Sequence, residues 1–475
     1  MTQFKLEGND DQEILFGSAQ ESITPYPYKQ LSLSGYGRFQ RCKGFHDKIY
    51  ARVNLFATKD DNDDVKIHLV LINYDLTGFG FQNMEILKTK LADEFNIREA
   101  GIYAFSTHSH YSPDTDGLMP APIFPNIIWK GRDPYLTEFI IKQTIKSVKS
   151  ALKELRPVKV GFGYTQFQER MVFNRRPPKG YYYILHPRIN IIKITDLDDK
   201  LIGAISVFPS HPVTIGRQYN EISGGWPGYF VRALKSKIGE TGDKDDGFIP
   251  LILQGPAGDV TFNYRNPKER EELLKRSRKD RQYYKAQRFG ELLADYVTKK
   301  LPNINTDKLV KIVNDAREIY MPVTPIYNGY NPKQLFNILA AAIKRVILIP
   351  GLKLFRRSKE VSFVKMEKYR PKGRVFKELR VKTFVGTFAL NEIIVTTNPG
   401  EPFNITEEQI RDRTGNENVV LAQLCNDCIG YNYSDPEKVY YPETYDIEMT
   451  FTQYTGLLTR NTAIKEVKEV SKKID

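Results

Sequence analysis

Several apolar runs along this chain end abruptly in loops that carry polar side chains. The first such run, residues 101–106, ends in a loop with two histidines, His108 and His110. In extended backbone, side chains at positions i and i+2 point to the same side, so both imidazoles can face one site. The same pattern recurs in four later runs, at 201–208, 249–254, 393–397 and 419–424. Each run is typical of a buried strand that delivers functional side chains at its end.

Other segments show the periodicities of helices and of paired strands. Residues 134–155 place apolar side chains three and four positions apart, as one buried helix face requires, and residues 83–96 have the same period. Residues 48–57 and 65–75 are typical of strands joined by an acidic turn. Strands that alternate with helices predict an α/β fold, here with mixed β-sheets covered by helices in a single large domain.

The five strand ends supply the candidate chemistry. Ligands of open α/β sheets gather at the carboxyl ends of strands, so we expect these ends to form the wall of one pocket. The third histidine at such an end is His211, and the remaining histidines are expected to be structural: His46, His68 and His186. Nitrogen and carboxylate ligands around an open position are typical of a hydrolytic zinc site. Serine catalysis is less favoured, because the chain has no Gly-x-Ser-x-Gly turn.

Length and composition suit one large domain or two ordinary ones. The chain has 475 residues, of which 41% are hydrophobic, enough for a sizeable core. No stretch of about 18 apolar residues is present, so no spanning helix is expected. Residues 1–20 contain acidic side chains and lack the apolar segment of a signal peptide, so we expect a cytoplasmic protein or one at the inner face of a membrane.

The charge balance favours an anionic partner. Lysines and arginines number 70 against 57 aspartates and glutamates, which gives a net charge of +13. Nucleic acid is not the predicted partner, because the basic residues are not interleaved with aromatic ones in a recognisable binding module. The densest basic stretch, 268–288, also holds acidic residues and is most simply a solvated helix face.

The cysteines do not indicate a structural framework. Three cysteines are too few for a set of disulfides in a chain of this size. Cys425 and Cys428 have the spacing of a metal or redox pair, but no second pair accompanies them. They are interpreted as partly buried thiols of a reducing compartment.

Several motifs resemble, in the same order, those of the neutral (non-lysosomal) ceramidase family. Residues 107–113, Thr-His-Ser-His-Tyr-Ser-Pro, resemble the Thr-His-Thr-His-Ser-Gly-Pro motif of that family. Four further segments resemble its Asn-Arg-Ser-Pro, Gly-Asp-Val-Ser-Pro-Asn, Pro-Gly-Glu and Gly-Tyr motifs, namely 174–177, 258–263, 399–401 and 430–431. Each motif is short, but together they run in the family's order from about residue 17 to about residue 446.

The resemblance implies a zinc amidase that cleaves the N-acyl bond of a sphingolipid. Carried over by position, the implied zinc ligands are His108, His211, Glu401 and Tyr431. His110 would lie beside the zinc as an acid, a base or an oxyanion partner. Arg175 and Tyr445 would orient the substrate or stabilise the tetrahedral intermediate. Thr261, at the position of a family serine, keeps the hydroxyl and is also a candidate catalytic residue.

The departures from the family pattern fall near the substrate and not among the metal ligands. Besides Thr261, Pro256 replaces an asparagine, and Ser22 replaces the aspartate of an early motif. We therefore expect the metal site of the family, without assuming that ceramide itself is the substrate. The C-terminal β-sandwich of the family is expected to be missing, because the sequence leaves no room for it.

The resemblance also sets the expected domain organisation. A polar leader (1–16) precedes a ceramidase-like catalytic domain (17–450), and an edge strand with a charged helix (451–475) follows it. Helical insertions are expected at about 268–300 and about 330–370.

One apolar segment, 335–357, contains cations and is flanked by them. It is too short and too charged to span a bilayer. It suits a basic amphipathic helix on an anionic membrane surface, a lid over a lipid pocket, or a buried core helix.

Three functions stay open from the sequence. The first is a zinc-dependent amidohydrolase that cleaves an N-acylated, lipid-like amide by metal-activated water. The second is a catalytically weak relative that binds a lipid or a membrane surface on the same scaffold. The third is a metal esterase or phosphatase, which would reject amides. The sequence does not indicate an oligomeric state.

Overall fold

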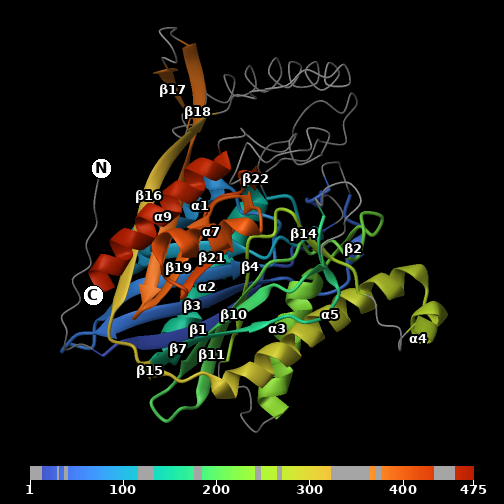
Figure 1. The fold of residues 1–475 in the computed structure, drawn as a ribbon, viewed down its shortest axis with the longest axis horizontal. Coiled ribbons are helices and arrows are strands. Elements are labelled where there is room, and N and C mark those ends of the chain that lie inside the picture. The colour runs from blue at the N-terminus through green and yellow to red at the C-terminus, as the bar shows by residue number, and fades with distance from the viewer. Residues whose placement is uncertain are drawn as a thin grey trace.

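Three five-stranded sheets form the body of the molecule, with helices on their outer sides (Figure 1). The structure is a computed structural model, and it describes residues 13–28, 31–36, 41–115, 133–175, 184–240, 248–264, 270–322, 364–369, 376–432 and 455–474. The combination of open mixed sheets and covering helices confirms the predicted α/β fold class. None of the described helices is long and apolar enough to cross a membrane.

The first sheet carries the strand that leads to His108. Its strands, in spatial order, are β5 (Ile102–Ser106), β4 (Val65–Tyr74), β3 (Tyr50–Lys59), β1 (Leu15–Ser22) and β6 (Arg156–Pro157). β4 and β5 are parallel, whereas β1, β3 and β4 pair antiparallel. Helices α1 (Phe81–Phe95) and α2 (Pro134–Ala151) pack on this sheet through a shared apolar core. The predicted leader was too long, because Leu15 and Phe16 are buried in β1.

The second sheet carries the strand that leads to His211. Its strands, in spatial order, are β13 (Leu251–Gln254), β11 (Leu201–Phe208), β10 (Arg188–Thr195), β7 (Lys159–Gln166) and β15 (Asp307–Lys308). Helices α3 (Gly225–Glu240) and α5 (Arg278–Lys300) lie beside it, and the short helix α4 (Arg270–Lys275) precedes α5 at a distance from the sheet (Figure 1). Helices α4 and α5 occupy the predicted helical insertion at 268–300. The Ser277 hydroxyl accepts a hydrogen bond from the Asp280 backbone and caps α5.

The third sheet carries the strands that lead to Glu401 and Tyr431. It consists of β16 (Ile312–Pro322), β18 (Phe376–Leu390), β19 (Ile393–Asn398) and β21 (Val419–Gln423), with β17 (Val364–Tyr369) paired to β18. Helices α7 (Ile405–Thr414) and α9 (Thr455–Ile474) cover it, and α9 lies where the charged C-terminal helix was predicted.

The second predicted insertion is wrong at one end. Residues 364–369 are strand β17, antiparallel to β18, so the helical insertion expected at about 330–370 does not include them. The rest of that insertion, together with the segment 335–357, lies outside the described residues. The same holds for the edge strand expected just after residue 450.

Short elements complete the chain around the site. The short strands are β2 (Gly44–Phe45), β8 (Val172–Asn174), β9 (Ile184–Leu185), β12 (Glu221–Ile222), β14 (Val260–Phe262), β20 (Glu401–Pro402) and β22 (Tyr431–Asn432). Single 3-10 turns lie at Glu99–Gly101, Leu152–Glu154 and Leu301–Asn303.

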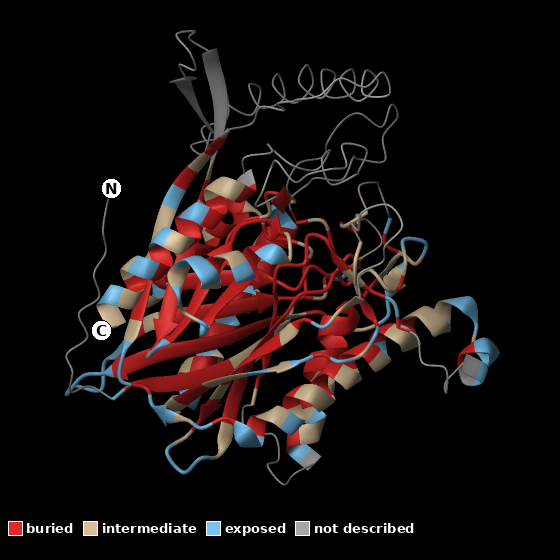
Figure 2. Cartoon of the chain, viewed as in Figure 1, coloured by how far each residue is buried: buried red, intermediate tan, exposed pale blue. Residues whose placement is uncertain are grey.

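The three sheets share one core, and hydrogen bonds join their strand ends. Phe16, Leu253 and Phe388, one from each sheet, belong to the same buried cluster. Figure 2 shows this buried centre, with exposed residues on the outward turns of the helices. The Gln254 side chain donates to the Thr107 carbonyl at 2.9 Å, which links the ends of β13 and β5. The ends of the five predicted strands therefore do meet in one region.

Candidate metal centre and active site

The loop after β5 places two imidazoles against each other. His108 and His110 are 4% and 7% exposed, and their Nε2 atoms are 3.1 Å apart. His108 does not have the extended backbone that the sequence suggested, since its φ is +64°, in the left-handed region. The two rings meet because the loop turns at His108, and not because of strand alternation.

The loop after β11 brings the third imidazole. His211 is fully buried, and its backbone bridges to Thr261 of β14. Its Nδ1 lies 2.6 Å from the Ala257 carbonyl oxygen. Because a carbonyl can only accept, this contact fixes the proton on Nδ1 and leaves a lone pair on Nε2.

Glu401 and Tyr431 enter from the third sheet as neighbours. β20 and β22 are parallel and pair these two residues directly. The Glu401 Oε2 atom lies 3.2 Å from His108 Nε2 and 2.9 Å from His211 Nε2. The Tyr431 ring stacks near His211, with ring centroids 6.1 Å apart.

The donor set fits a divalent cation. One nitrogen from each of His108, His110 and His211 lies within 4.8 Å of the others. The Nδ1 atom of His108 donates to the Thr77 carbonyl at 2.8 Å, so its Nε2, like that of His211, carries a lone pair. These lone pairs face Glu401 Oε2, which is buried without a hydrogen-bond donor in the described structure. A cation among these atoms would satisfy all of them at once.

The pKa shifts in the cluster favour the protonation states that a metal needs. Burial, together with the Arg175 cation, lowers the pKa of His211 to about 4. Burial, and then His108 and His211, bring the pKa of His110 well below its usual value. Histidine binds a metal as the neutral imidazole, the form that these directions favour at neutral pH.

Arg175 extends the cluster on the side of Tyr431. Its Nη2 atom donates to the Tyr431 hydroxyl at 2.9 Å and to the Gly258 carbonyl at 2.7 Å, and it lies 3.4 Å from His211 Nε2. The guanidinium thus places a permanent positive charge beside the histidine and the phenol.

Comparison with known proteins identifies the family. A family model described as neutral/alkaline non-lysosomal ceramidase, N-terminal, matches residues 15–287. The chain belongs to this family. The neutral ceramidase of Pseudomonas aeruginosa is 23% identical over an alignment of 344 positions, which covers 69% of this chain and 48% of the relative. The chain thus spans about half the length of the curated relative that it matches.

Solved structures show the same fold. The crystal structure of the neutral ceramidase from Pseudomonas aeruginosa has a TM-score of 0.70 and 16% identity, with 98% of this chain and 75% of that chain covered. A structure described as ceramidase complexed with C2 has a TM-score of 0.68 and 15% identity, with 98% and 76% covered. The ceramidase fold is therefore present along nearly the whole chain.

The remaining predicted residues differ in where the structure places them. Thr261 lies in β14, half-buried, and joins the site through its backbone bridge to His211. Tyr445, expected from the ceramidase pattern, lies outside the described residues. Cys425 is buried and Cys428 half-buried, and neither forms a disulfide. Among the described residues, neither cysteine belongs to the cluster of three histidines.

Thr77 is a residue that the sequence analysis missed. Its carbonyl accepts from His108, its hydroxyl donates to the Ser109 carbonyl at 2.6 Å, and Ser34 donates to that hydroxyl at 2.5 Å. Two residues earlier, Asp75 forms a fully buried ion pair with Arg52, at 2.7 Å and 2.8 Å. Thr77 follows the end of β4, a sixth strand end that a search for polar strand ends would have found.

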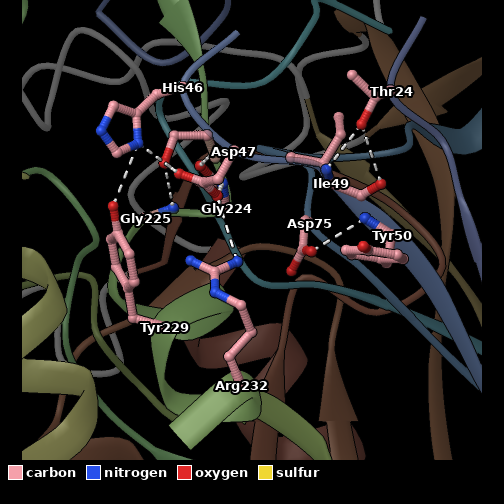
Figure 3. A network of polar contacts seen from close by, with 12 residues as sticks. Thr24, His46, Asp47, Ile49, Tyr50, Asp75, Gly224, Gly225, Tyr229 and Arg232 are labelled. Atoms are coloured by element: carbon pink, nitrogen blue, oxygen red, sulfur yellow. Dashed lines mark hydrogen bonds and ion pairs between the residues drawn. The ribbon is translucent and has the colours of Figure 1, made fainter.

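Asp47 is a second missed residue, on the opposite side of the histidine loop. Its carboxylate accepts from the Ser223 hydroxyl at 2.6 Å and the Gly224 backbone at 3.0 Å, and His46, Tyr229 and Arg232 surround it (Figure 3). The backbone of Ser223 contacts the histidine loop: its carbonyl accepts from the Ser109 hydroxyl at 2.7 Å, and its amide donates to the Tyr111 carbonyl at 3.0 Å. The histidine loop is thus held from both sides, by Thr77 and by the turn that Asp47 orders.

Proposed function

We propose that this chain is a zinc-dependent hydrolase that cleaves the N-acyl amide bond of a ceramide-like or other N-acylated lipid. The observation that carries the proposal is the convergence of the His108 and His211 Nε2 atoms on the buried Glu401 Oε2, which has no hydrogen-bond donor among the described residues. Membership of the ceramidase family and the names of the relatives support the amide as the bond that is cleaved.

Zinc is the proposed ion because imidazole nitrogen with carboxylate oxygen is its usual ligand set in hydrolases. The residues that would hold it are His108, His211, Glu401 and Tyr431. When bound, such an ion lowers the pKa of a water to about 7 and polarises a carbonyl oxygen. The remaining polar groups of the site would act on the substrate and on protons.

Arg175 is proposed to stabilise the negative charge that develops on the amide oxygen. Its guanidinium is held by the Gly258 carbonyl and by the Tyr431 hydroxyl, so it needs no rearrangement during the reaction. A preorganised cation of this kind is worth more in a buried site than in water.

His110 is proposed to move the proton. Its Nε2 lies 3.1 Å from His108 Nε2, so it is close to any group bound at that nitrogen. Its Nδ1 is buried without a hydrogen-bond partner among the described residues, so Nε2 is the nitrogen of this ring that faces the site. Nε2 can therefore accept a proton from the attacking water and return it to the leaving amine, which an amide requires.

Metal analysis and product analysis together test the proposal. Protein purified without chelator should hold about one zinc per chain, and mass spectrometry should find the fatty acid and the amine from an N-acyl amide and sphingolipid library. His108→Ala should lose both zinc and hydrolysis, whereas the exposed control His186→Ala should keep both. Hydrolysis of esters alone would point to a metal esterase, and lipid binding without zinc would point to a binding relative.

A further inference from the structure

Three aromatic rings, two of them exposed, lie together on the surface near β2. The ring centroids of Tyr26 and Tyr28 are 6.2 Å apart, and those of Tyr28 and Phe45 are also 6.2 Å apart. Tyr26 is 88% exposed and Phe45 is 51% exposed. Tyr28 is half-buried and packs against the core of the first sheet. We call these three residues the aromatic patch, in which the anchored ring of Tyr28 supports the other two.

Two lysines lie next to the aromatic patch. Lys43 and Lys48 flank Phe45 along the chain, and both side chains are exposed. Within the described residues, neither lysine is paired with a carboxylate. The pairing of β2 with β12 fixes the backbone of Phe45 between them. Exposed rings and uncompensated positive charges thus occur side by side in a chain whose net charge is +13.

The chain runs from the aromatic patch toward the candidate active site. The Leu31 backbone donates to the Tyr28 carbonyl at 3.0 Å, and the Ser34 backbone donates to the Ser112 carbonyl, also at 3.0 Å. Tyr36 then packs edge-on against His110, with ring centroids 5.0 Å apart. Only a few residues of chain therefore separate the exposed rings from the histidine cluster.

Among the described residues, the other exposed aromatic side chains do not form such a patch. Tyr135 is 89% exposed at the start of α2, and no ring of the part of the chain that the structure describes pairs with it. Tyr164 is 48% exposed, and the Arg188 guanidinium covers its ring at 3.6 Å. Isolated exposed rings are ordinary on a protein surface, whereas joined rings with flanking cations need a reason.

We propose that the aromatic patch, with Lys43 and Lys48, docks this protein on an anionic lipid bilayer. Aromatic rings are favoured at the level of lipid headgroups, and lysines near an anionic surface add attraction. The inference rests on the proposed function, because a lipid-like substrate resides in such a surface. Docking through this patch would bring residues 31–36, and with them the His110 side of the site, close to the bilayer.

Vesicle sedimentation with the full chain tests whether the aromatic patch binds a lipid bilayer. Wild-type protein should bind vesicles of phosphatidylcholine with 30% phosphatidylglycerol, roughly the composition of an anionic membrane, and bind pure phosphatidylcholine more weakly. The K43E/K48E variant should lose about 30-fold or more in binding to the anionic vesicles, because each lysine near such a surface contributes about 1 kcal/mol. The Y26S/F45S variant should lose about tenfold or more. The control Y135S should bind like the wild type.

The outcomes separate this inference from the proposed function. Loss of binding in both double variants, with unchanged thermal unfolding and unchanged hydrolysis of a water-soluble short-chain amide, supports the surface. Wild-type affinity in either double variant, equal weakening by Y135S, or no vesicle binding by the wild type would overturn it. Loss of vesicle binding in K43E/K48E alone would point to another polyanion as the partner, and it would also overturn the proposal of a bilayer. Absence of amide hydrolysis in the wild type would refute the proposed function and leave the vesicle result standing.

Discussion

The carbonyl oxygen of Thr77 lies 2.8 Å from Nδ1 of His108 and fixes which nitrogen of that imidazole carries its proton. The same residue holds the next peptide through its hydroxyl, which donates to the Ser109 carbonyl. His108 has a left-handed backbone, which costs about 1–3 kcal/mol and persists only where neighbours enforce it. Thr77 is the neighbour that contacts both the ring and the backbone of this loop.

Thr77→Val should therefore weaken metal binding more than it weakens the fold. Valine keeps the shape but removes the hydroxyl that donates to the Ser109 carbonyl and accepts from Ser34, which should cost about 1–3 kcal/mol of unfolding free energy. Zinc affinity, measured by competition with a chromophoric chelator, should fall by about 10- to 100-fold, as for other residues that support metal ligands. Thr77→Ser keeps the hydroxyl and should restore the affinity.

A buried threonine away from the site is the matched control for that experiment. The Thr144 hydroxyl contacts Tyr74 and the Ile140 carbonyl, each at 2.8 Å, inside the first sheet's core. Thr144→Val should lower stability by a similar amount and leave zinc affinity unchanged. Equal effects of the two valine variants on zinc would show that Thr77 acts only through the fold.

Arg175→Lys should slow hydrolysis without removing the metal. A lysine keeps the charge, but its single ammonium cannot reproduce the geometry of a guanidinium that contacts Gly258 and Tyr431 together. We expect kcat for amide hydrolysis to fall by about 10²- to 10³-fold, the usual effect of losing one preorganised donor to a developing oxyanion. The zinc content should match that of the wild type.

The same substitution at Arg188, which stacks on Tyr164 outside the site, should leave kcat unchanged. If Arg175→Lys instead loses zinc and activity in parallel, the residue retains the metal and does not act on the substrate.

Gly35→Ala should disturb His110 specifically. Gly35 has a φ of +113°, and a Cβ at this position would overlap the His110 ring. Alanine is strained in this conformation, so the unfolding free energy should fall by more than about 1 kcal/mol, and hydrolysis should fall further because His110 must move. Urea unfolding and initial rates on one amide measure the two effects.

Gly239 offers the contrasting position for the same substitution. It lies in α3, and no atom of the described residues comes within 4 Å of an added Cβ, so Gly239→Ala should stabilise the protein by roughly 0.5–1 kcal/mol at unchanged activity. A Gly35→Ala variant that behaves like Gly239→Ala would contradict the close packing against His110.

The sequence predicted the site's strands better than its loops, for a physical reason. The runs that became β5, β11, β13, β19 and β21 are apolar because the sheets bury them, and such runs can be read locally. The left-handed turn at His108 and the role of Thr77 depend on contacts between residues about 30 positions apart, which composition does not encode. Asp47 was missed for the same reason, since it contacts Ser223.

A buried carboxyl in the loop after β21, that of Asp427, allows a test of how stability depends on pH. Asp427 is 8% exposed, and burial raises its pKa from 3.8 to about 6, against the hydrogen bond from Thr383 at 2.7 Å. The folded state binds the proton more tightly than the unfolded state. The contribution of this carboxyl to the free energy of unfolding is therefore fully present below about pH 3.8 and is lost as the pH rises through about 6. Asp427→Asn should thus stabilise the protein at pH 8 by at most about 3 kcal/mol and leave stability near pH 4 unchanged. Urea unfolding of both proteins at the two pH values measures this difference, and an equal difference at both would show that the carboxyl does not titrate in this range.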